Sequence, residues 1–158
     1  MTIKAIVFDV DGTLTDGGIY IGPSGEVMKR FDVKDGYAIH TLMPQNNILP
    51  IIITGRKSEI VEMRCKELGI KHIYQGVSNK VQQLKDVINL LKIGLDEVAY
   101  FGDDINDLAS MRLTGYSGCP ADAVNEVKNN ADYICQNAGG HSAAREFIEK
   151  VIRDKTSR

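Results

Sequence analysis

The sequence predicts an α/β fold, a Rossmann-like, doubly wound, mainly parallel sheet with helices on both faces. Short apolar, β-branched runs alternate along the chain with longer segments of helical periodicity, which is the order expected of a parallel sheet. Three of the strongest runs end directly before Asp9, Thr54 and Gly102-Asp103. Sheets of this class bind ligands beyond the carboxyl ends of their strands, so we expect these polar ends to converge at one edge.

The expected elements follow in order along the chain. The predicted strands are Ile3–Phe8, Ile48–Ile53, His72–Tyr74, Val98–Phe101, and the weaker Tyr116–Cys119 and Asp132–Cys135. Helical patterns lie between or after them, at about Asp35–Gln45, Lys57–Leu68, Asn79–Leu91, Asn106–Leu113, Ala123–Asn129 and Ser142–Ile152. A chain of 158 residues suits one domain, residues 1–158, with little room for a second.

One segment breaks the alternation of strands and helices. Gly17–Val33 has the pattern of a protruding hairpin, in which a Gly-Pro-Ser-Gly turn joins Ile19–Ile21 to Val27–Val33. An isolated two-stranded hairpin is marginal in water, so we expect this one to pack on its own domain or on another subunit. Near the other end, Gly139-Gly140 forms an apparent hinge before a C-terminal tail of about residues 138–158.

Composition excludes several classes of protein. Hydrophobic residues make up 43% of the chain and charged residues 25%, which is enough apolar surface for a folded core. The longest apolar run is far shorter than the roughly 20 residues of a membrane span. A net charge of −2 argues against binding nucleic acid by phosphate neutralisation. Three isolated cysteines without metal-site spacing indicate reduced core thiols in a cytoplasmic protein.

The most specific pattern is a set of acidic motifs at the strand ends. Asp9-Val10-Asp11-Gly12-Thr13 follows the first strand, and Gly102-Asp103-Asp104-Ile105-Asn106-Asp107 follows the fourth. A lone Asp-x-Asp is usually a polar loop, but here Thr54-Gly55 and Lys80 accompany it. Clustered carboxylates repel one another unless a cation is present, and oxygen ligands of this kind suit Mg²⁺. With a hydroxyl, a backbone amide and a lysine to hold phosphate, the set describes an aspartyl-phosphate site.

These motifs, in this order, resemble the haloacid dehalogenase phosphatase superfamily over nearly the whole chain. The resemblance implies that Asp9 is the nucleophile and that Asp11 is the general acid and then the base, with Thr54 and Lys80 as further catalytic residues. It also implies metal binding by Asp9, by the carbonyl of Asp11 and by Asp103. Asp104 and Asp107 are expected to hold Lys80 and the metal-bound waters.

A narrower resemblance concerns DGGIYIGPSGE, KRFDVKDGYAI, ITGRKSEIVEMRCKELGI, IYQGVSNK and GGHSAAREFI. These segments are similar to those of capless, tetrameric phosphatases of 3-deoxy-D-manno-octulosonate 8-phosphate (KDO 8-phosphate). The intervals between the motifs leave no room for a cap domain. The family implies a homotetramer in which four hairpins form a barrel and a Gly-Gly-containing tail reaches a neighbour's active site. The usual GGxGAxRE pattern has Ser142 in place of a glycine here.

The expected substrate is a small anionic sugar-acid phosphate. Gly55, Arg56, Arg64 and Arg145 are the candidate substrate-binding residues, since guanidinium groups bind phosphate and carboxylate in bidentate fashion. Arg64 could equally be an arginine at the rim of the core, because it interrupts an apolar helix stripe. The alternatives are a sialic acid or KDN 9-phosphate phosphatase and a catalytically silent oligomerisation module of the CMP-sialic acid synthetase type. The KDN 9-phosphate phosphatases also resemble this chain, but they have Glu at the position of Arg56, which favours the eight-carbon acid.

Overall fold

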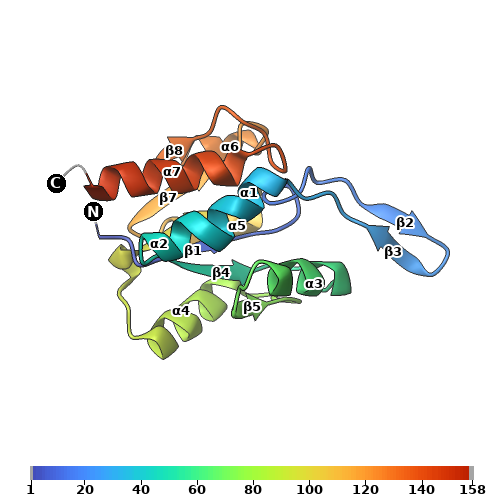
Figure 1. Ribbon diagram of the computed structural model, residues 1–158, viewed down its shortest axis with the longest axis horizontal. Coiled ribbons are helices and arrows are strands. Elements are labelled where there is room, and N and C mark those ends of the chain that lie inside the picture. Colours follow the sequence, from blue (N-terminus) through green and yellow to red (C-terminus); the bar gives the residue numbers. More distant parts are fainter. Residues whose placement is uncertain (1, 157–158) are drawn as a thin grey trace.

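A six-stranded sheet covered by helices forms the body of the molecule in the computed structural model, which describes residues 2–156 (Figure 1). The strands lie in the order β5-β4-β1-β6-β7-β8, and all their pairings are parallel. Their bounds are β1 Ala5–Phe8, β4 Leu49–Ile53, β5 His72–Tyr74, β6 Val98–Phe101, β7 Tyr116–Cys119 and β8 Tyr133–Ile134. The chain builds outward from β1 first on one side and then on the other, which confirms the doubly wound order and creates a crevice beyond β1.

Helices cover both faces of this sheet, as predicted. Ile6 and Phe8 of β1 belong to one apolar cluster, and Ala5 and Val7 belong to a second. The first cluster includes side chains of the N-terminal helical segment, α3 and α7, whereas the second includes side chains of α4, α5 and α6. The helices are α1 Val33–Tyr37, α2 Met43–Gln45, α3 Glu59–Glu67, α4 Lys80–Leu91, α5 Ile105–Met111, α6 Asn125–Lys128 and α7 Ala143–Thr156, with a 3-10 turn at Leu95–Glu97. In the part of the chain that the structure describes, none of them is both long and apolar enough to cross a bilayer.

The first helical segment begins two residues before the expected position. Asp32 caps α1, and its side chain accepts a hydrogen bond from the Lys34 amide at 2.7 Å. The segment continues through a π turn at Ala38–Leu42 into α2. Because Pro44 lacks an amide hydrogen for the regular helical bond, a change of helical pattern next to it is physically reasonable.

The antiparallel hairpin of β2 (Tyr20–Gly22) and β3 (Gly25–Met28) projects from the body beyond α3 (Figure 1). A bridge between Thr15 and Phe31 closes its base. The second strand ends at Met28 rather than at Val33 as predicted, since beyond it only the isolated Thr15–Phe31 bridge continues the pairing and α1 already begins at Val33.

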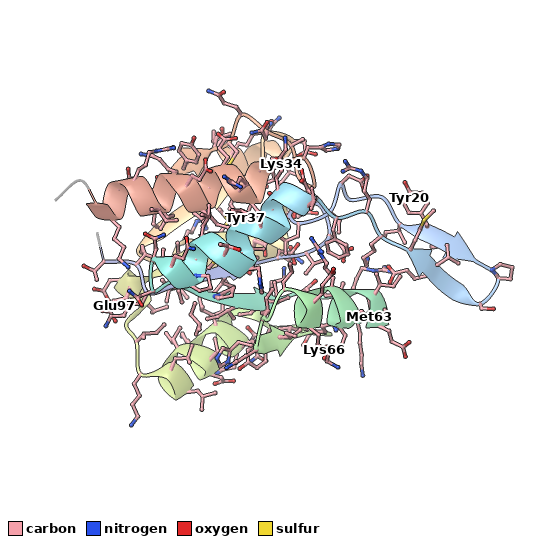
Figure 2. The ribbon with its side chains drawn as sticks, in the orientation of Figure 1. Tyr20, Lys34, Tyr37, Met63, Lys66 and Glu97 are labelled. Atoms are coloured by element: carbon pink, nitrogen blue, oxygen red, sulfur yellow. The ribbon has the colours of Figure 1, made fainter. Side chains whose placement is uncertain are left out.

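Apolar side chains are exposed along the hairpin and on the neighbouring helix. Ile21, Val27 and Met28 of the hairpin are 73%, 58% and 54% exposed. Tyr20 on β2 and Met63 on α3, both labelled in Figure 2, are also exposed, by 42% and 72%. An apolar surface of this kind at a hairpin edge is typical of a contact with another chain.

The C-terminal helix, predicted at Ser142–Ile152 within the tail that follows Gly139-Gly140, is part of the core. Five side chains of α7 are fully buried: Ala143, Ala144, Phe147, Ile148 and Val151. The ring of Phe147 stacks on Phe101, with 4.7 Å between the ring centroids. The apolar periodicity of this helix therefore reports packing against its own sheet.

Candidate active site

The crevice beyond β1 collects the polar residues that follow three strands. A pocket of about 200 Å³ lies there. It is lined by Asp9, Asp11, Thr54, Gly55, Arg56, Asp103, Asp104 and Asn106. The Asp9 amide donates to the carbonyl of Phe101 at 3.0 Å, which continues the β1–β6 pairing and fixes where the acidic loop starts. Seven of the predicted site residues therefore meet in one pocket, and Asn106 joins them.

Lys80 lies behind the pocket and joins two carboxylates. Its Nζ donates to Asp9 Oδ1 and to Asp107 Oδ1, each at 2.7 Å. Lys80 is only 5% exposed to solvent. Although burial opposes it, the charges of Asp9 and Asp107 raise the pKa of Lys80 above its ordinary value. Lys80 is thus a fixed, protonated ammonium beside Asp9.

Asp107 is fully buried and accepts several hydrogen bonds. Besides Lys80, the Tyr100 hydroxyl donates to Oδ1 at 2.9 Å, and the amides of Asp103 and Asp104 donate to Oδ2 at 3.2 and 3.4 Å. The contact with Lys80 was expected from the sequence. Asp104, in contrast, caps α5 by accepting from the Ile105 amide, instead of contacting Lys80.

Asp9, Asp103 and Asp107 bring carboxylate oxygens within 4.8 Å of one another. Burial and the nearby Asp107 charge raise the pKa of Asp9 to about 6, despite the opposing effect of Lys80. Burial and the Asp9 charge likewise raise the pKa of Asp103 to about 7. Because Asp107 already accepts from the protein at both oxygens, Asp9 and Asp103 are the better cation ligands. This donor set of hard oxygens fits Mg²⁺.

The loop after β1 approaches Asp103 closely at Gly12. The Thr13 hydroxyl donates to Asp103 Oδ1 at 2.9 Å. Gly12 has φ +86°, and a Cβ there would lie 2.2 Å from Asp103 Oδ2. Only glycine fits this position, since a side chain would be strained and would displace the carboxylate.

Asp11 pairs with a lysine that sequence reasoning missed. Lys29, at the end of the hairpin, forms an ion pair with Asp11 and another with Glu26 at 2.6 Å. Arg56 Nε lies 4.0 Å from Asp11 Oδ2. Lys29 lies in the irregular segment between β3 and α1, and the sequence carried no spacing pattern that would reveal its contact with Asp11.

Two predicted substrate-binding residues lie away from this pocket. Arg64 donates to Glu67 Oε2 at 2.8 Å and lies over the Phe31 ring, 5.8 Å from its centroid. Arg145 pairs with Glu149 at 2.5 Å and lies over Tyr37. The structure therefore places both arginines in contacts between or along helices of the described chain.

Comparison with known proteins gives consistent matches. The sequence model of the haloacid dehalogenase-like hydrolase family matches residues 69–147. The 3-deoxy-D-manno-octulosonate 8-phosphate phosphatases KdsC of Salmonella typhi and Escherichia coli K12 are 45% and 44% identical over 150 residues, which are 95% of this chain and 79% of each relative.

Solved structures match over almost the whole chain. A probable YrbI family phosphatase from Pseudomonas syringae superposes with a TM-score of 0.94 at 41% identity, covering 98% of this chain and 88% of that one. The 3-deoxy-D-manno-octulosonate 8-phosphate phosphatase from Moraxella catarrhalis, solved with magnesium, phosphate and KDO, superposes with a TM-score of 0.92 at 38% identity. The match covers 96% of this chain and 87% of that one. These matches share the fold described above.

Proposed function

We propose that this chain, which belongs to the haloacid dehalogenase-like hydrolases and among them to the 3-deoxy-D-manno-octulosonate 8-phosphate phosphatases, hydrolyses KDO 8-phosphate to KDO and phosphate. The observation that carries this proposal is the buried Asp9–Lys80–Asp107 array behind the pocket. It supplies an oriented carboxylate beside a fixed positive charge, in a chain 45% identical to enzymes named for this reaction.

The reaction proceeds through an aspartyl phosphate. A carboxylate oxygen of Asp9 attacks phosphorus, the bond from phosphorus to the sugar oxygen breaks, and Asp11 gives its proton to that oxygen. Asp11 then takes a proton from a water molecule, which attacks phosphorus and releases Asp9 and phosphate. Lys80 orients Asp9 and faces the developing phosphoryl charge, while the Thr54 hydroxyl and the Gly55 amide bind phosphoryl oxygens.

Magnesium is the cofactor that this site fits. Asp9, Asp103 and the carbonyl of Asp11 would hold it. When bound, the cation neutralises charge on the phosphoryl oxygens. Asp107 keeps Lys80 in place, and Thr13 orients Asp103 through its hydroxyl.

For the substrate, Arg56 is the arginine that lines the pocket, and its side chain is 48% exposed. It is suited to bind an anionic group of the sugar acid. Arg64 and Arg145 could act on substrate only in an assembly or conformation that moves them from their present partners. A sialic acid or KDN 9-phosphate phosphatase is the alternative, and Arg56 favours the eight-carbon acid. The intact Asp9–Lys80–Asp107 array favours an enzyme over a silent assembly module.

We further propose a cytoplasmic, capless homotetramer held by the hairpins. The exposed Ile21, Val27 and Met28 need a partner surface, and rotational symmetry would close four hairpin edges on one another. A neighbour's hairpin would then roof each open pocket. Light scattering should give a mass near four chains. A fully active monomer at nanomolar concentration would reject this assembly.

Phosphate release across a panel of sugar phosphates, with and without magnesium, tests the function. KDO 8-phosphate should give the highest kcat/KM, above sialic acid 9-phosphate and hexose phosphates. The Asp9→Asn variant is the matched blank for each substrate. Equal efficiency on neutral and acidic sugars would contradict recognition of a sugar acid.

A further inference from the structure

Four charged side chains form a second cluster at the mouth of the pocket. Asp11 comes from the loop after β1, Glu26 and Lys29 from the hairpin, and Arg56 from the loop after β4. The cluster contains two carboxyl groups and two cations. It connects the hairpin of this chain to its own active-site loops.

Lys29 is the centre of this cluster. Its side chain has no exposed surface, and its ammonium lies between Asp11 Oδ1 and Glu26 Oε1. Although burial opposes it, the hydrogen bonds to Asp11 and Glu26 raise the pKa of Lys29. A buried ammonium held between two carboxyl groups has little freedom to move, because leaving either one would break a buried hydrogen bond.

Glu26 fixes Lys29 from the other side. The Ser58 hydroxyl, at the start of α3, donates to Glu26 Oε2 at 2.5 Å. Arg56 Nη2 lies 3.9 Å from Glu26 Oε1. Glu26 is thereby anchored to the body of the molecule even though it lies in β3.

We infer that Lys29 and Glu26 are positioning residues for Asp11, so that the hairpin takes part in the chemistry of its own chain. Lys29 donates to Asp11 Oδ1, so the proton that Asp11 gives to the leaving oxygen is carried by Oδ2, on the side of Arg56 and the pocket. Proton transfer to the leaving oxygen needs an Asp11 oxygen held within hydrogen-bond reach. Glu26 acts through Lys29. This inference rests on the proposed function, since it assigns Asp11 the role of acid.

The dependence on the leaving group separates positioning of an acid from general damage. KDO 8-phosphate expels an alkoxide, which needs a proton, whereas p-nitrophenyl phosphate expels a phenolate that leaves without one. The ratio kcat/KM reports the first phosphoryl transfer for both substrates. Lys29→Met should lower it at least about tenfold more for KDO 8-phosphate than for p-nitrophenyl phosphate. Lys34→Met, at an exposed lysine five residues away, is the control and should leave both values unchanged.

Two further variants test the coupling and guard against misfolding. Lys29→Arg keeps the charge and should recover part of the alkyl phosphate rate. Glu26→Gln keeps the shape and should show the same substrate-selective loss, about threefold to tenfold, which disappears in the Lys29→Met background. Equal losses on both substrates, or an increase in KM alone, would overturn the inference. Wild-type protein that hydrolyses neither substrate would instead reject the proposed function.

Discussion

Replacing Asp107 with asparagine tests the polar array behind the pocket. The change keeps the shape of the side chain but turns one acceptor oxygen into an amide donor. Both oxygens of Asp107 accept from the protein, Oδ1 from Lys80 and Tyr100, and Oδ2 from two backbone amides. In either orientation of the asparagine amide, its NH₂ group would face a donor that now binds an Asp107 oxygen, so at least one of these hydrogen bonds is lost.

The magnitude follows from these contacts. An unsatisfied buried polar group costs about 1–3 kcal/mol, and breaking a buried ion pair by removing one partner costs about 3–5 kcal/mol. We expect Asp107→Asn to lower the free energy of unfolding by about 3 kcal/mol, because Lys80 keeps Asp9 as a partner. Loosening of Lys80 should lower kcat/KM by about a hundredfold, or ~2.7 kcal/mol of transition-state stabilisation.

Urea denaturation and phosphate release measure the two effects. Asp86→Asn is the matched control, since Asp86 is exposed on α4 and its carboxylate accepts from the Gln82 side chain. The free energy of unfolding of this variant should stay within about 0.5 kcal/mol of wild type. Unchanged stability together with unchanged turnover in Asp107→Asn would refute the reasoning.

The remaining predictions concern chemistry, metal, substrate and pH. Asp9→Asn should abolish phosphate release, because an amide is a poor nucleophile and a weaker cation ligand; normal turnover would exclude the covalent route. EDTA should remove activity, magnesium should restore it and calcium should replace it poorly, since Ca²⁺ takes a larger, looser coordination shell; full activity in metal-free buffer would contradict this. Arg56→Ala should raise KM for KDO 8-phosphate more than Arg64→Ala does, because Arg56 alone of the two lines the pocket; the reverse order would place substrate near α3. Burial raises the pKa of Asp35 to about 7, so the unfolded chain releases this proton first and the fold loses stability as the pH rises from about 4 to 7; Asp35→Asn should reduce that fall in a series of Tm measurements, and an identical pH profile would show that Asp35 does not contribute.

The sequence was sufficient for the fold and for much of the pocket because both depend on local patterns. A buried strand such as β1 is apolar at every position, and a polar residue directly after it must lie at the sheet edge. The parallel order then brings Asp9, Thr54 and Asp103 together without further information. The contact of Asp107 with Lys80 was expected from the family resemblance and not from strand order, since β5 and β6, which precede them, are not neighbours in the sheet.

Contacts that depend on side-chain direction or on irregular segments could not be predicted. Lys29, which pairs with Asp11, lies in the irregular segment directly after β3. The direction of the Arg64 side chain depends on how α3 packs next to Phe31. The helical repeat alone does not tell whether an arginine at this position contacts Phe31 or the substrate. The apolar face of α7 was visible in the sequence, but Gly139-Gly140 suggested a hinge, whereas burial of residues such as Phe147 shows a packed helix.

The close packing of Gly139 and Gly140 on the loop after β1 has a consequence for synthesis of the protein. A Cβ at Gly139 would lie 2.0 Å from the Gly12 carbonyl, and one at Gly140 would lie 2.5 Å from the Asp16 amide. The ribosome releases Gly12 long before either glycine, and β1 must also wait for β6 to complete its pairing. The catalytic loop therefore reaches its final form only when the last fifth of the chain has emerged. Until β6 emerges, β1 can pair only with β4 and keeps one edge of an apolar strand open, which makes the nascent chain a natural client for chaperones that shield such segments.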